Sequence, residues 1–323
     1  MHGPTPLVRL PRLAARFGLD LWIKRDDASG GVEAGNKVRK LEFLLGEARA
    51  RQADTVITCG GIQSNHARAT AVLAAQLGMK SVLVLRADDV HAALPISGNV
   101  LIDRMVGASI RLIDNEQWRD RNGIMAQEAS AIDRAGGRSY VIPEGGSNGL
   151  GTLGYVEAMA EVRAQLDLGL GGGRPFDAIV HACGSGGTAA GIALGAAAYD
   201  VAPVVHPMAV CNDAAYFQAV IASIIAEARS IVPALPAPAG VVVDDASKGP
   251  AYAVSSDEQR AFIVEMARLC GLVLDPVYTG KGLHGLAQWV RRDGSLVGKR
   301  VLFVHTGGLP GLLAQGEEFE RNL

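Results

Sequence analysis

The sequence predicts an α/β protein of two domains, in which twisted, mainly parallel sheets are covered by helices. Short runs rich in Val and Ile alternate with amphipathic or Ala-rich segments, and nearly continuous apolar strands are typical of parallel sheets buried on both faces. The chain has 323 residues, 49% hydrophobic and 20% charged, so it can bury a core larger than that of one average domain. Many of the 40 glycines stand at the ends of apolar runs, where tight turns require glycine.

Eight apolar runs are expected to be strands. They are residues 21–24, 55–58, 81–85, 110–113, 140–142, 178–182, 203–210 and 300–305. The segments between them predict helices over residues 37–51, 65–77, 123–135, 153–166, 188–198, 216–228 and 256–269. The Gly- and Pro-rich segments 169–175 and 230–240 are interpreted as surface loops.

Four glycine-rich turns follow expected strands and precede expected helices. They span residues 59–65, 143–148, 183–188 and 306–308. In open parallel sheets, ligands bind at the carboxyl edge of the strands. The geometry of one strand-to-helix turn explains its glycines as well as ligand binding does. Four such turns in one chain favour a ligand site.

Charge and cysteine usage exclude several classes of protein. The net charge is −2 and no long basic run occurs, so neither nucleic acid nor an anionic membrane is an expected partner, and small molecules are. The segment Met1–Pro6 lacks the pattern of a signal peptide, and no apolar run reaches the roughly 20 residues that span a bilayer. A cytoplasmic protein is therefore expected. The scattered cysteines and histidines predict no metal site and no disulfide framework.

Lys37 and Lys40 stand at the start of an expected helix, after the turn-forming segment 34–36, and only seven lysines occur in the chain. A cation is unfavourable at a helix N-terminus because the macrodipole is positive there. Lys37 would avoid this cost as a neutral imine with an aldehyde cofactor. From composition alone, a basic cluster on a solvated helix is the simpler explanation.

The turn of residues 183–188 is the natural phosphate cradle, because it offers backbone N–H groups and hydroxyls at a helix start. The pattern GxxxxGK[ST] is absent, which argues against a nucleoside triphosphate site. A dinucleotide site is the closer rival, although only Asp200, in an expected loop, could act as its acidic residue. Tyr278 lies in a turn before a helix expected from Leu283, either as an acid–base group or as a packed aromatic.

Taken together, these segments resemble the fold-type II pyridoxal-phosphate enzymes, which share the fold of the tryptophan synthase β subunit. The similarity runs nearly end to end and is strongest to the branch of D-cysteine desulfhydrases and 1-aminocyclopropane-1-carboxylate deaminases. The motifs that carry it are Thr5-Pro6-Leu7, Ile23-Lys24-Arg25-Asp26-Asp27, Gly35-Asn36-Lys37-Val38-Arg39-Lys40-Leu41-Glu42-Phe43, Gly61-Ile62-Gln63-Ser64-Asn65-His66, Val141-Ile142-Pro143, Gly145-Gly146-Ser147, Gly184-Ser185-Gly186-Gly187-Thr188, Asp275-Pro276-Val277-Tyr278 and His305-Thr306-Gly307-Gly308.

The resemblance implies a role for each matching residue. Lys37 would hold the pyridoxal phosphate as a Schiff base, and Asn65 would lie against the cofactor ring and its 3′-oxygen. The phosphate would be bound by Lys40 and by the loop of Cys183, Gly184, Ser185, Gly186, Gly187 and Thr188. The substrate carboxylate would be received by Ser64, Asn65 and His66, with Ser64 also taking part in proton transfer.

Two tyrosines and two threonines would complete the site. Tyr252 and Tyr278 would line the substrate pocket and act in catalysis. Thr279 would contact the substrate and Thr306 the cofactor, where the deaminases carry Glu and Leu. A hydroxyl beside the pyridine nitrogen leaves the ring a weaker electron sink, which suits β-elimination better than cyclopropane opening. Ala34, where many relatives have glycine, is a departure without an expected chemical effect.

The resemblance also implies how the chain divides and what it does. Residues 1–39 and 150–323 would form the larger, cofactor-binding domain and residues 40–149 the smaller one, with the cofactor in the cleft and the protein a homodimer. The implied reaction is β-elimination on a small amino acid, D-cysteine above all, giving pyruvate, hydrogen sulfide and ammonia. The alternatives are an L-cysteate sulfo-lyase or another lyase of β-substituted alanines, a 1-aminocyclopropane-1-carboxylate deaminase, and a non-catalytic nucleotide- or metabolite-binding protein.

Overall fold

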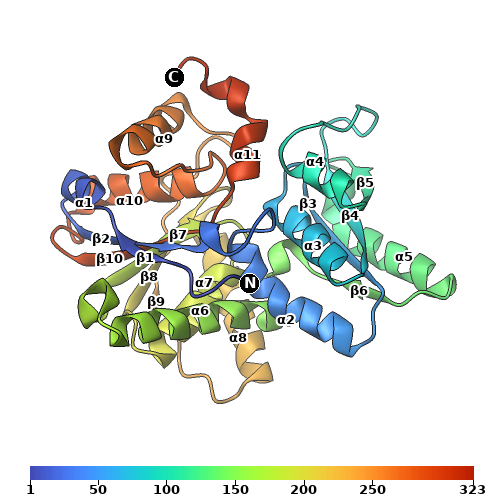
Figure 1. Ribbon diagram of the computed structural model, residues 1–323, viewed down its shortest axis with the longest axis horizontal. Coiled ribbons are helices and arrows are strands. Elements are labelled where there is room, and N and C mark those ends of the chain that lie inside the picture. The colour runs from blue at the N-terminus through green and yellow to red at the C-terminus, as the bar shows by residue number, and fades with distance from the viewer.

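The computed structural model describes residues 1–323 and contains two separate sheets (Figure 1). The larger sheet has the strand order β1-β2-β10-β7-β8-β9, and the smaller has the order β5-β4-β3-β6. All neighbouring strands are parallel except β1, which is antiparallel to β2. The strands are β1 (Leu7–Arg9), β2 (Asp20–Arg25), β3 (Thr55–Gly61), β4 (Lys80–Arg86), β5 (Ser109–Ile113), β6 (Ser139–Val141), β7 (Ala178–Cys183), β8 (Val204–Ala209), β9 (Gly240–Val241) and β10 (Arg300–His305).

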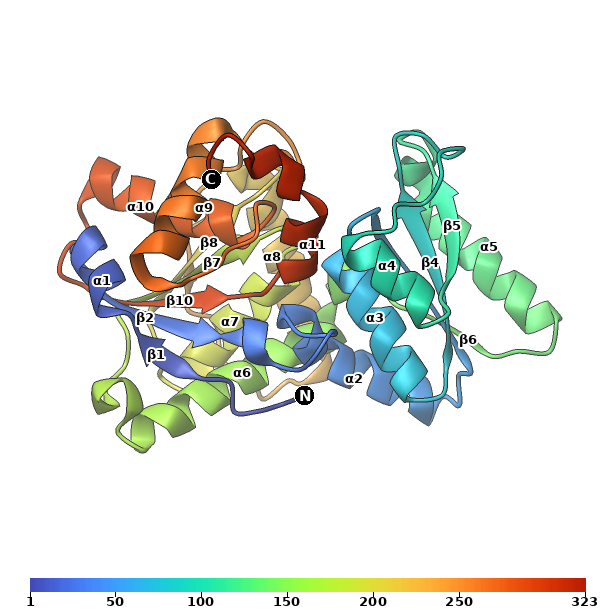
Figure 2. The ribbon, with the colours of Figure 1, turned by 45° about the horizontal axis from the view of Figure 1, so that its top comes forward.

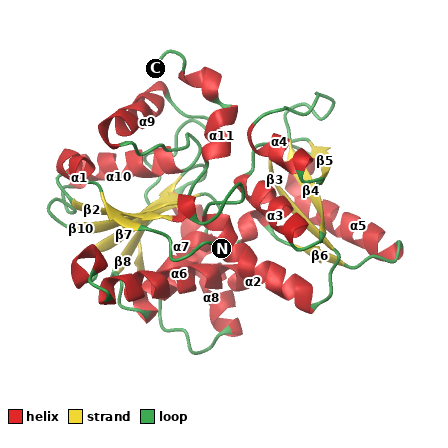
Figure 3. Cartoon of the chain, viewed as in Figure 1, coloured by secondary structure: helices red, strands yellow, loops and turns green.

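Helices cover both faces of each sheet (Figure 3). The helices are α1 (Pro11–Phe17), α2 (Asn36–Ala50), α3 (Asn65–Gln76), α4 (Gly98–Met105), α5 (Arg121–Arg134), α6 (Gly149–Asp167), α7 (Gly187–Ala198), α8 (Ala214–Ile231), α9 (Asp257–Cys270), α10 (Thr279–Asp293) and α11 (Leu309–Ala314). On the larger sheet, α1, α9 and α10 pack on one face, and α6 and α7 on the other. On the smaller sheet, α2 and α3 share a core with Val56, while α5 packs against Ile57 from the opposite face. None of the helices combines the length and apolar character that crossing a bilayer requires.

The eight strands and seven helices expected from the sequence all form, with ends that differ by a few residues. Five short elements were not expected: β1, β9, α1, α4 and α11. The helix expected from Leu283 begins at Thr279, because the Asp275 carboxylate accepts the N–H groups of Tyr278 and Thr279 and so caps that end. Of the expected loops, 170–173 form a 3-10 turn and 230–231 end α8.

The strands of the smaller sheet come from one continuous stretch, between Thr55 and Val141, whereas the larger sheet takes strands from both sides of it (Figure 2). The boundaries predicted for the two domains stay a prediction. Helix α2 leads out of the larger part of the structure, and α6 packs against it. The two helices cross at Gly154, where an added Cβ would overlap the Arg39 carbonyl, so the backbones can approach this closely only at a glycine.

A buried polar network fixes the N-terminal part of α2 to the larger sheet. Arg39 donates to both carboxylate oxygens of Asp26, at 2.9 and 2.8 Å, and also contacts Glu161. Tyr155 and Thr5 donate to the same carboxylate at 2.6 and 2.8 Å. Burial acts to raise the pKa of Asp26, but the charge and hydrogen bonds of Arg39, with the help of Lys24 and Tyr155, outweigh it and hold that pKa below its usual value.

Replacing Arg39 by leucine is predicted to lower the free energy of unfolding by about 3–5 kcal/mol at pH 7, because the Asp26 carboxylate would stay buried without its charged partner, with only the hydroxyls of Tyr155 and Thr5 to bind it. As a control, Arg51→Leu removes an exposed pair with Glu47 on the same helix and should cost less than about 0.5 kcal/mol. A depressed carboxyl pKa contributes stability that is lost as the pH falls. The deficit of Arg39→Leu in urea titrations should therefore shrink below about pH 4; equal deficits at pH 3 and 7 would contradict this account.

Candidate active site

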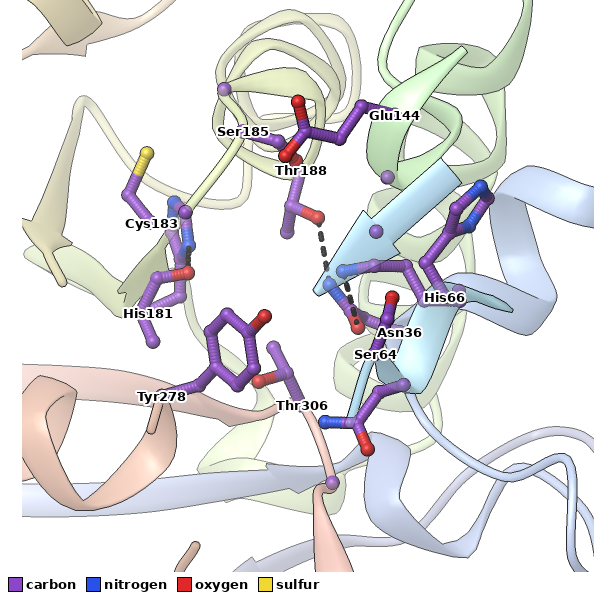
Figure 4. Close-up of a pocket in the computed structure, with 18 of the residues that line it drawn as sticks. Asn36, Ser64, His66, Glu144, His181, Cys183, Ser185, Thr188, Tyr278 and Thr306 are labelled. Atoms are coloured by element: carbon purple, nitrogen blue, oxygen red, sulfur yellow. Dashed lines mark hydrogen bonds between the residues drawn. The ribbon is translucent and has the colours of Figure 1, made fainter. Parts of the chain in front are cut away.

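A cavity lies between the carboxyl end of β3, in the smaller sheet, and the carboxyl ends of β7 and β10, in the larger sheet (Figure 4). Both sheets therefore contribute to its wall, as expected for open parallel sheets. Twelve residues singled out in the sequence line it: Lys37, Ser64, Asn65, His66, Cys183, Gly184, Ser185, Gly186, Thr188, Tyr252, Tyr278 and Thr306. Lys40, Gly187 and Thr279 are not part of the wall.

Lys37, the second residue of α2, faces the cavity. The turn before it is pressed against the end of β10: the Asn36 N–H donates to the Thr306 carbonyl at 3.1 Å, and an added Cβ at Gly35, where φ is 128°, would lie 2.9 Å from that oxygen. The Lys37 Nζ donates to Asn36 Oδ1 at 3.2 Å. Desolvation lowers the pKa of Lys37 to about 8, so the lysine is a far better nucleophile at neutral pH than an exposed one.

The loop of residues 183–188 ends in the first turn of α7, whose leading N–H groups have no partner inside the helix. Thr188 Oγ1 accepts a hydrogen bond from Asn36 Nδ2 at 3.0 Å, which ties this loop to the lysine turn. The Ser185 hydroxyl lies 2.8 Å from that of Ser147. Gly186 has a φ of 81°, which favours glycine. A helix N-terminus flanked by hydroxyls suits a phosphate group, so the geometry fits the predicted cradle.

Lys40 lies behind this loop and not in the cavity. Its Nζ donates to the Gly145 carbonyl at 3.1 Å and to Ser147 Oγ at 3.0 Å. An added Cβ at Gly187 would lie 2.9 Å from the Lys40 Nζ, so nothing larger than glycine fits between this loop and the Lys40 amine. Burial, reinforced by the positive charge of Lys37, lowers the pKa of Lys40 well below its usual value. The geometry thus places Lys40 as a support of the cradle.

Two tyrosines, Tyr252 and Tyr278, form part of the cavity wall. The hydroxyls of Tyr252 and Tyr278 lie 2.7 Å apart, and the Tyr278 ring centroid is 5.9 Å from the Lys37 Nζ. Desolvation raises the pKa of Tyr252 to about 12 and holds that of Tyr278 well above its usual value, so both phenols stay protonated at neutral pH. Since one hydroxyl donates to the other, one O–H of the pair is free to donate to a bound molecule.

Thr279 departs from its predicted place beside the substrate. Its hydroxyl is buried, donates to Asp275 Oδ1 at 2.7 Å and accepts the Asp275 N–H at 2.9 Å. It serves the cap of α10 and has no free hydrogen for a ligand. Thr306, by contrast, does line the cavity, so it is the threonine of the predicted pair whose hydroxyl a ligand can reach.

The start of α3 presents the third group of predicted residues. Ser64 is its N-cap and accepts the Ala67 N–H at 3.2 Å, which leaves the N–H groups of Asn65 and His66 free at the helix end. Thr58 Oγ1 donates to a backbone carbonyl and lies 2.8 Å from His66 Nε2, so that nitrogen is the donor. Burial keeps the pKa of His66 well below its usual value. A neutral imidazole cannot pair with a carboxylate as a cation, so the backbone N–H is the group His66 offers to an anion.

Nine residues of the wall were not selected from the sequence: Asn36, Gly60, Gly61, Glu144, Gly145, His181, Ala182, Ala189 and Gly307. His181 is the most informative, since its Nε2 is buried without a hydrogen-bond partner and burial lowers its pKa to about 4. It stands inside an apolar strand, where no pattern marks a functional side chain. Asn36, in contrast, adjoins Lys37 within a recognised motif and could have been found.

The comparisons with known proteins agree with this geometry. The family model described as pyridoxal-phosphate dependent enzyme matches residues 1–307. A bifunctional D-cysteine desulfhydrase/1-aminocyclopropane-1-carboxylate deaminase of Arabidopsis thaliana is 42% identical over 96% of this chain and 78% of its own length. A D-cysteine desulfhydrase of Yersinia enterocolitica is 36% identical over 96% of this chain and 93% of its own. The crystal structure of an ACC deaminase homologue superposes with a TM-score of 0.87 and 35% identity, covering 100% of this chain and 94% of the other.

The chain therefore belongs to the family of pyridoxal-phosphate-dependent enzymes. Within that family it belongs to the branch of D-cysteine desulfhydrases and 1-aminocyclopropane-1-carboxylate deaminases. The fold class and the cofactor predicted from the sequence are confirmed. The cavity fits this cofactor, because a desolvated lysine amine and a helix N-terminus that can take a phosphate open into one space.

The lowered pKa of Lys37 predicts that, in cofactor-free protein, its amine reacts with acetic anhydride along a pH curve whose midpoint lies near 8 instead of 10.5. Only the neutral amine is nucleophilic, so the labelled fraction of the Lys37 peptide, measured by mass spectrometry, should follow that curve. Exposed Lys80 provides the internal reference. A Lys37 curve centred near 10.5 would show that the amine is not desolvated.

Proposed function

We propose that this chain catalyses β-elimination from D-cysteine, in which D-cysteine and water give pyruvate, ammonia and hydrogen sulfide. The observation that carries the proposal is the pairing of a desolvated amine, Lys37, with two protonated phenols, Tyr252 and Tyr278, across one cavity. The reaction needs both a base for the Cα proton and an acid for the leaving sulfur. The names of the two curated relatives support the same substrate.

Four groups of this chain would hold the cofactor. Lys37 would bind its aldehyde carbon, the first turn of α7 with Ser185 and Thr188 its phosphate, Asn65 its phenolic oxygen, and Thr306 its ring nitrogen. Pyridoxal phosphate, once bound, supplies the electron-accepting ring that makes the Cα proton acidic. The buried ion pair of Asp26 and Arg39 keeps Lys37 in place. Lys37 and Arg39 belong to the first turn of α2, and Asp26 holds that turn by accepting from Arg39.

The N-terminus of α3 would receive the substrate carboxylate. The free N–H groups of Asn65 and His66 and the Ser64 hydroxyl lie together on the cavity wall, and the positive end of the helix favours an anion. This contact would orient the amino acid so that its Cα–H faces the Lys37 amine. A helix end orients a carboxylate without a charged side chain, which leaves Lys37 as the one lysine or arginine on the wall.

Proton movement would then involve three groups: the Lys37 amine, the Ser64 hydroxyl and the tyrosine pair. The neutral amine of Lys37 takes the Cα proton, with Ser64 as the neighbouring group that can relay it. As the Cβ–S bond breaks, its electron pair stays on sulfur, and the free O–H of the tyrosine pair donates to the departing thiolate. The raised pKa values of Tyr252 and Tyr278 keep these hydroxyls protonated until that moment.

The hydroxyl of Thr306 favours elimination over cyclopropane opening. A hydroxyl beside the ring nitrogen does not protonate it as an acid would, and expulsion of a good leaving group from Cβ needs a weaker electron sink than ring opening does. Thr279 adds nothing to this argument, because its hydroxyl is committed to Asp275. The homodimer, the cytoplasmic location and the domain boundaries expected from the sequence remain predictions.

When the enzyme that carries pyridoxal phosphate is assayed with D-cysteine, L-cysteine and D-serine, we expect pyruvate and sulfide from D-cysteine above all. Lys37→Ala should lower kcat by at least about 10²–10⁴-fold, because it removes the positioned base. Tyr278→Phe should lower kcat for D-cysteine and leave KM nearly unchanged, since the phenol acts on the leaving group. Turnover of another substrate without D-cysteine would refute the substrate, and full activity of Lys37→Ala would refute the mechanism.

A second candidate substrate is favoured by one arginine at the mouth of the cavity. The half-buried Arg86 guanidinium lies 5.0 Å from the Trp118 ring centroid and 5.7 Å from that of Tyr252, and no carboxylate pairs with it. The neighbouring Arg121 already forms an ion pair with Glu144, at 3.1 Å. Because Tyr252 belongs to both the mouth and the inner cavity, Arg86 stands where it can receive an anionic Cβ substituent. L-cysteate and water would then give pyruvate, ammonia and sulfite.

Replacing Arg86 by glutamine should lower kcat/KM for L-cysteate by about 10- to 100-fold relative to D-cysteine, the range that a hydrogen bond to a charged group contributes. Arg119→Gln is the matched control, since it removes one exposed positive charge next to Trp118. Pyruvate release from both substrates is the measurement. An unchanged ratio of the two kcat/KM values in Arg86→Gln would exclude this role and leave the D-cysteine proposal standing.

A further inference from the structure

Asn99 is a fully buried amide that reaches the cavity wall only through another residue. It is the second residue of α4, after Gly98, whose φ is 56°. An added Cβ at Gly98 would lie 2.6 Å from Gln63 Oε1 and 2.7 Å from the Pro310 carbonyl. This close approach brings the start of α4 against the turn that precedes α3, and so places Asn99 beside Gln63 and Asn65.

The hydrogen bonds of Asn99 define which way its amide points. Its backbone N–H donates to Gln63 Oε1 at 2.8 Å, and its side-chain Nδ2 donates to the Gln63 carbonyl at 2.9 Å. A backbone carbonyl can only accept, so the side-chain atom of Asn99 that faces it must be the nitrogen. The second hydrogen of that nitrogen points to the Asn65 side chain, at 3.1 Å.

The direction of Asn65 follows from that of Asn99. The atom that accepts from Asn99 Nδ2 must be Asn65 Oδ1, so the Asn65 NH2 group is on the other side of the amide. Asn65 lines the cavity, and its Nδ2 has no hydrogen-bond partner within the protein. The amide therefore presents two N–H donors, and not its carbonyl oxygen, to whatever the cavity binds.

The buried carbonyl oxygen of the Asn99 side chain shows that the NH2 group of this amide is the group with a function. Its Oδ1 is buried without a partner, an arrangement that costs stability. A buried unpaired polar atom in a native protein calls for an explanation. Here the explanation is the donor side of the same amide, which has two acceptors and controls a residue of the active site.

We propose that Asn99 is a positioning residue that holds Asn65 with its NH2 group toward the phenolic oxygen of the cofactor. The inference rests on the cofactor contact assigned to Asn65 in the proposed function. A donor stabilises the deprotonated, negatively charged form of that oxygen, whereas the Asn65 carbonyl in its place would repel it. Asn99 is not part of the cavity wall, so its effect reaches the cavity through the residues it holds, Asn65 directly and Gln63 in the turn before α3.

The decisive variant is Asn99→Asp, which keeps the shape and replaces the donor by a carboxylate. Asn65 is then expected to turn over, donate to the new carboxylate and direct its oxygen at the cofactor. The Kd of pyridoxal phosphate should rise by about 10-fold or more, and the pH midpoint of the cofactor absorbance should move upward. Asn99→Ala, which removes both groups, should give a smaller shift in the same direction. Asn115→Asp adds the same charge at an exposed amide and should change neither value.

A double-mutant cycle separates positioning from a general structural role. In the Asn65→Ala background, Asn99→Asp should add little to the change in Kd and in absorbance, because the amide that it controls is gone. Additive effects, or an unchanged absorbance midpoint in folded Asn99→Asp, would overturn the proposal. The melting temperature of each cofactor-free variant shows whether it is folded. None of these measurements uses a substrate. A wild-type protein that binds the cofactor but does not act on D-cysteine would therefore refute the proposed function and not the role of Asn99.

Discussion

The buried ion pair between Asp26 and Arg39 is the interaction on which the arrangement of the active site depends. Arg39 is two residues after Lys37 on α2, so their side chains leave the helix about 200° apart. Arg39 is turned into the larger part of the structure, where Asp26, Tyr155, Thr5 and Glu161 hold it, and Lys37 is thereby turned into the cavity. A helix that slid or rotated would leave two charges buried without partners, which is why the lysine is placed reproducibly.

The electrostatics of the cavity follow from burial more than from its formal charges. Two lysines lie in or behind the wall, and desolvation lowers the pKa of both. His66 and His181 stay neutral for the same reason, and the phenols and the Cys183 thiol stay protonated because burial raises their pKa values. The site therefore offers mostly uncharged hydrogen-bonding groups that burial has desolvated. Such a site binds an anionic cofactor and an anionic substrate without assembling a cluster of full positive charges.

Two helix N-termini, one from each sheet, meet at this cavity. Helix α7 brings the glycine loop from the larger sheet, and α3 brings Ser64 and Asn65 from the smaller one. Asn36 donates a hydrogen bond to Thr188, and the hydroxyls of Ser185 and Ser147 are hydrogen-bonded to each other, which joins the neighbouring segments. Because parallel strands present the helix starts at their carboxyl edges, the fold itself brings two helix N-termini that can bind anions to one cavity, and we propose that one takes the phosphate and the other the substrate carboxylate.

The sequence by itself determined the strands, most of the helices and the glycine turns, because these depend on local patterns of apolar residues and glycine. Its family motif also singled out Lys37 as the predicted cofactor lysine. Only the tertiary structure decided where individual side chains point. Thr279 is drawn to Asp275 and away from the cavity, Lys40 lies behind Gly187, and Asn99 sets the direction of Asn65. Each of these outcomes depends on donors and acceptors from different turns and helices, and such partners meet only when the elements pack. Local spacing names the residue that can do the chemistry, whereas contacts between elements decide which of its atoms faces the ligand.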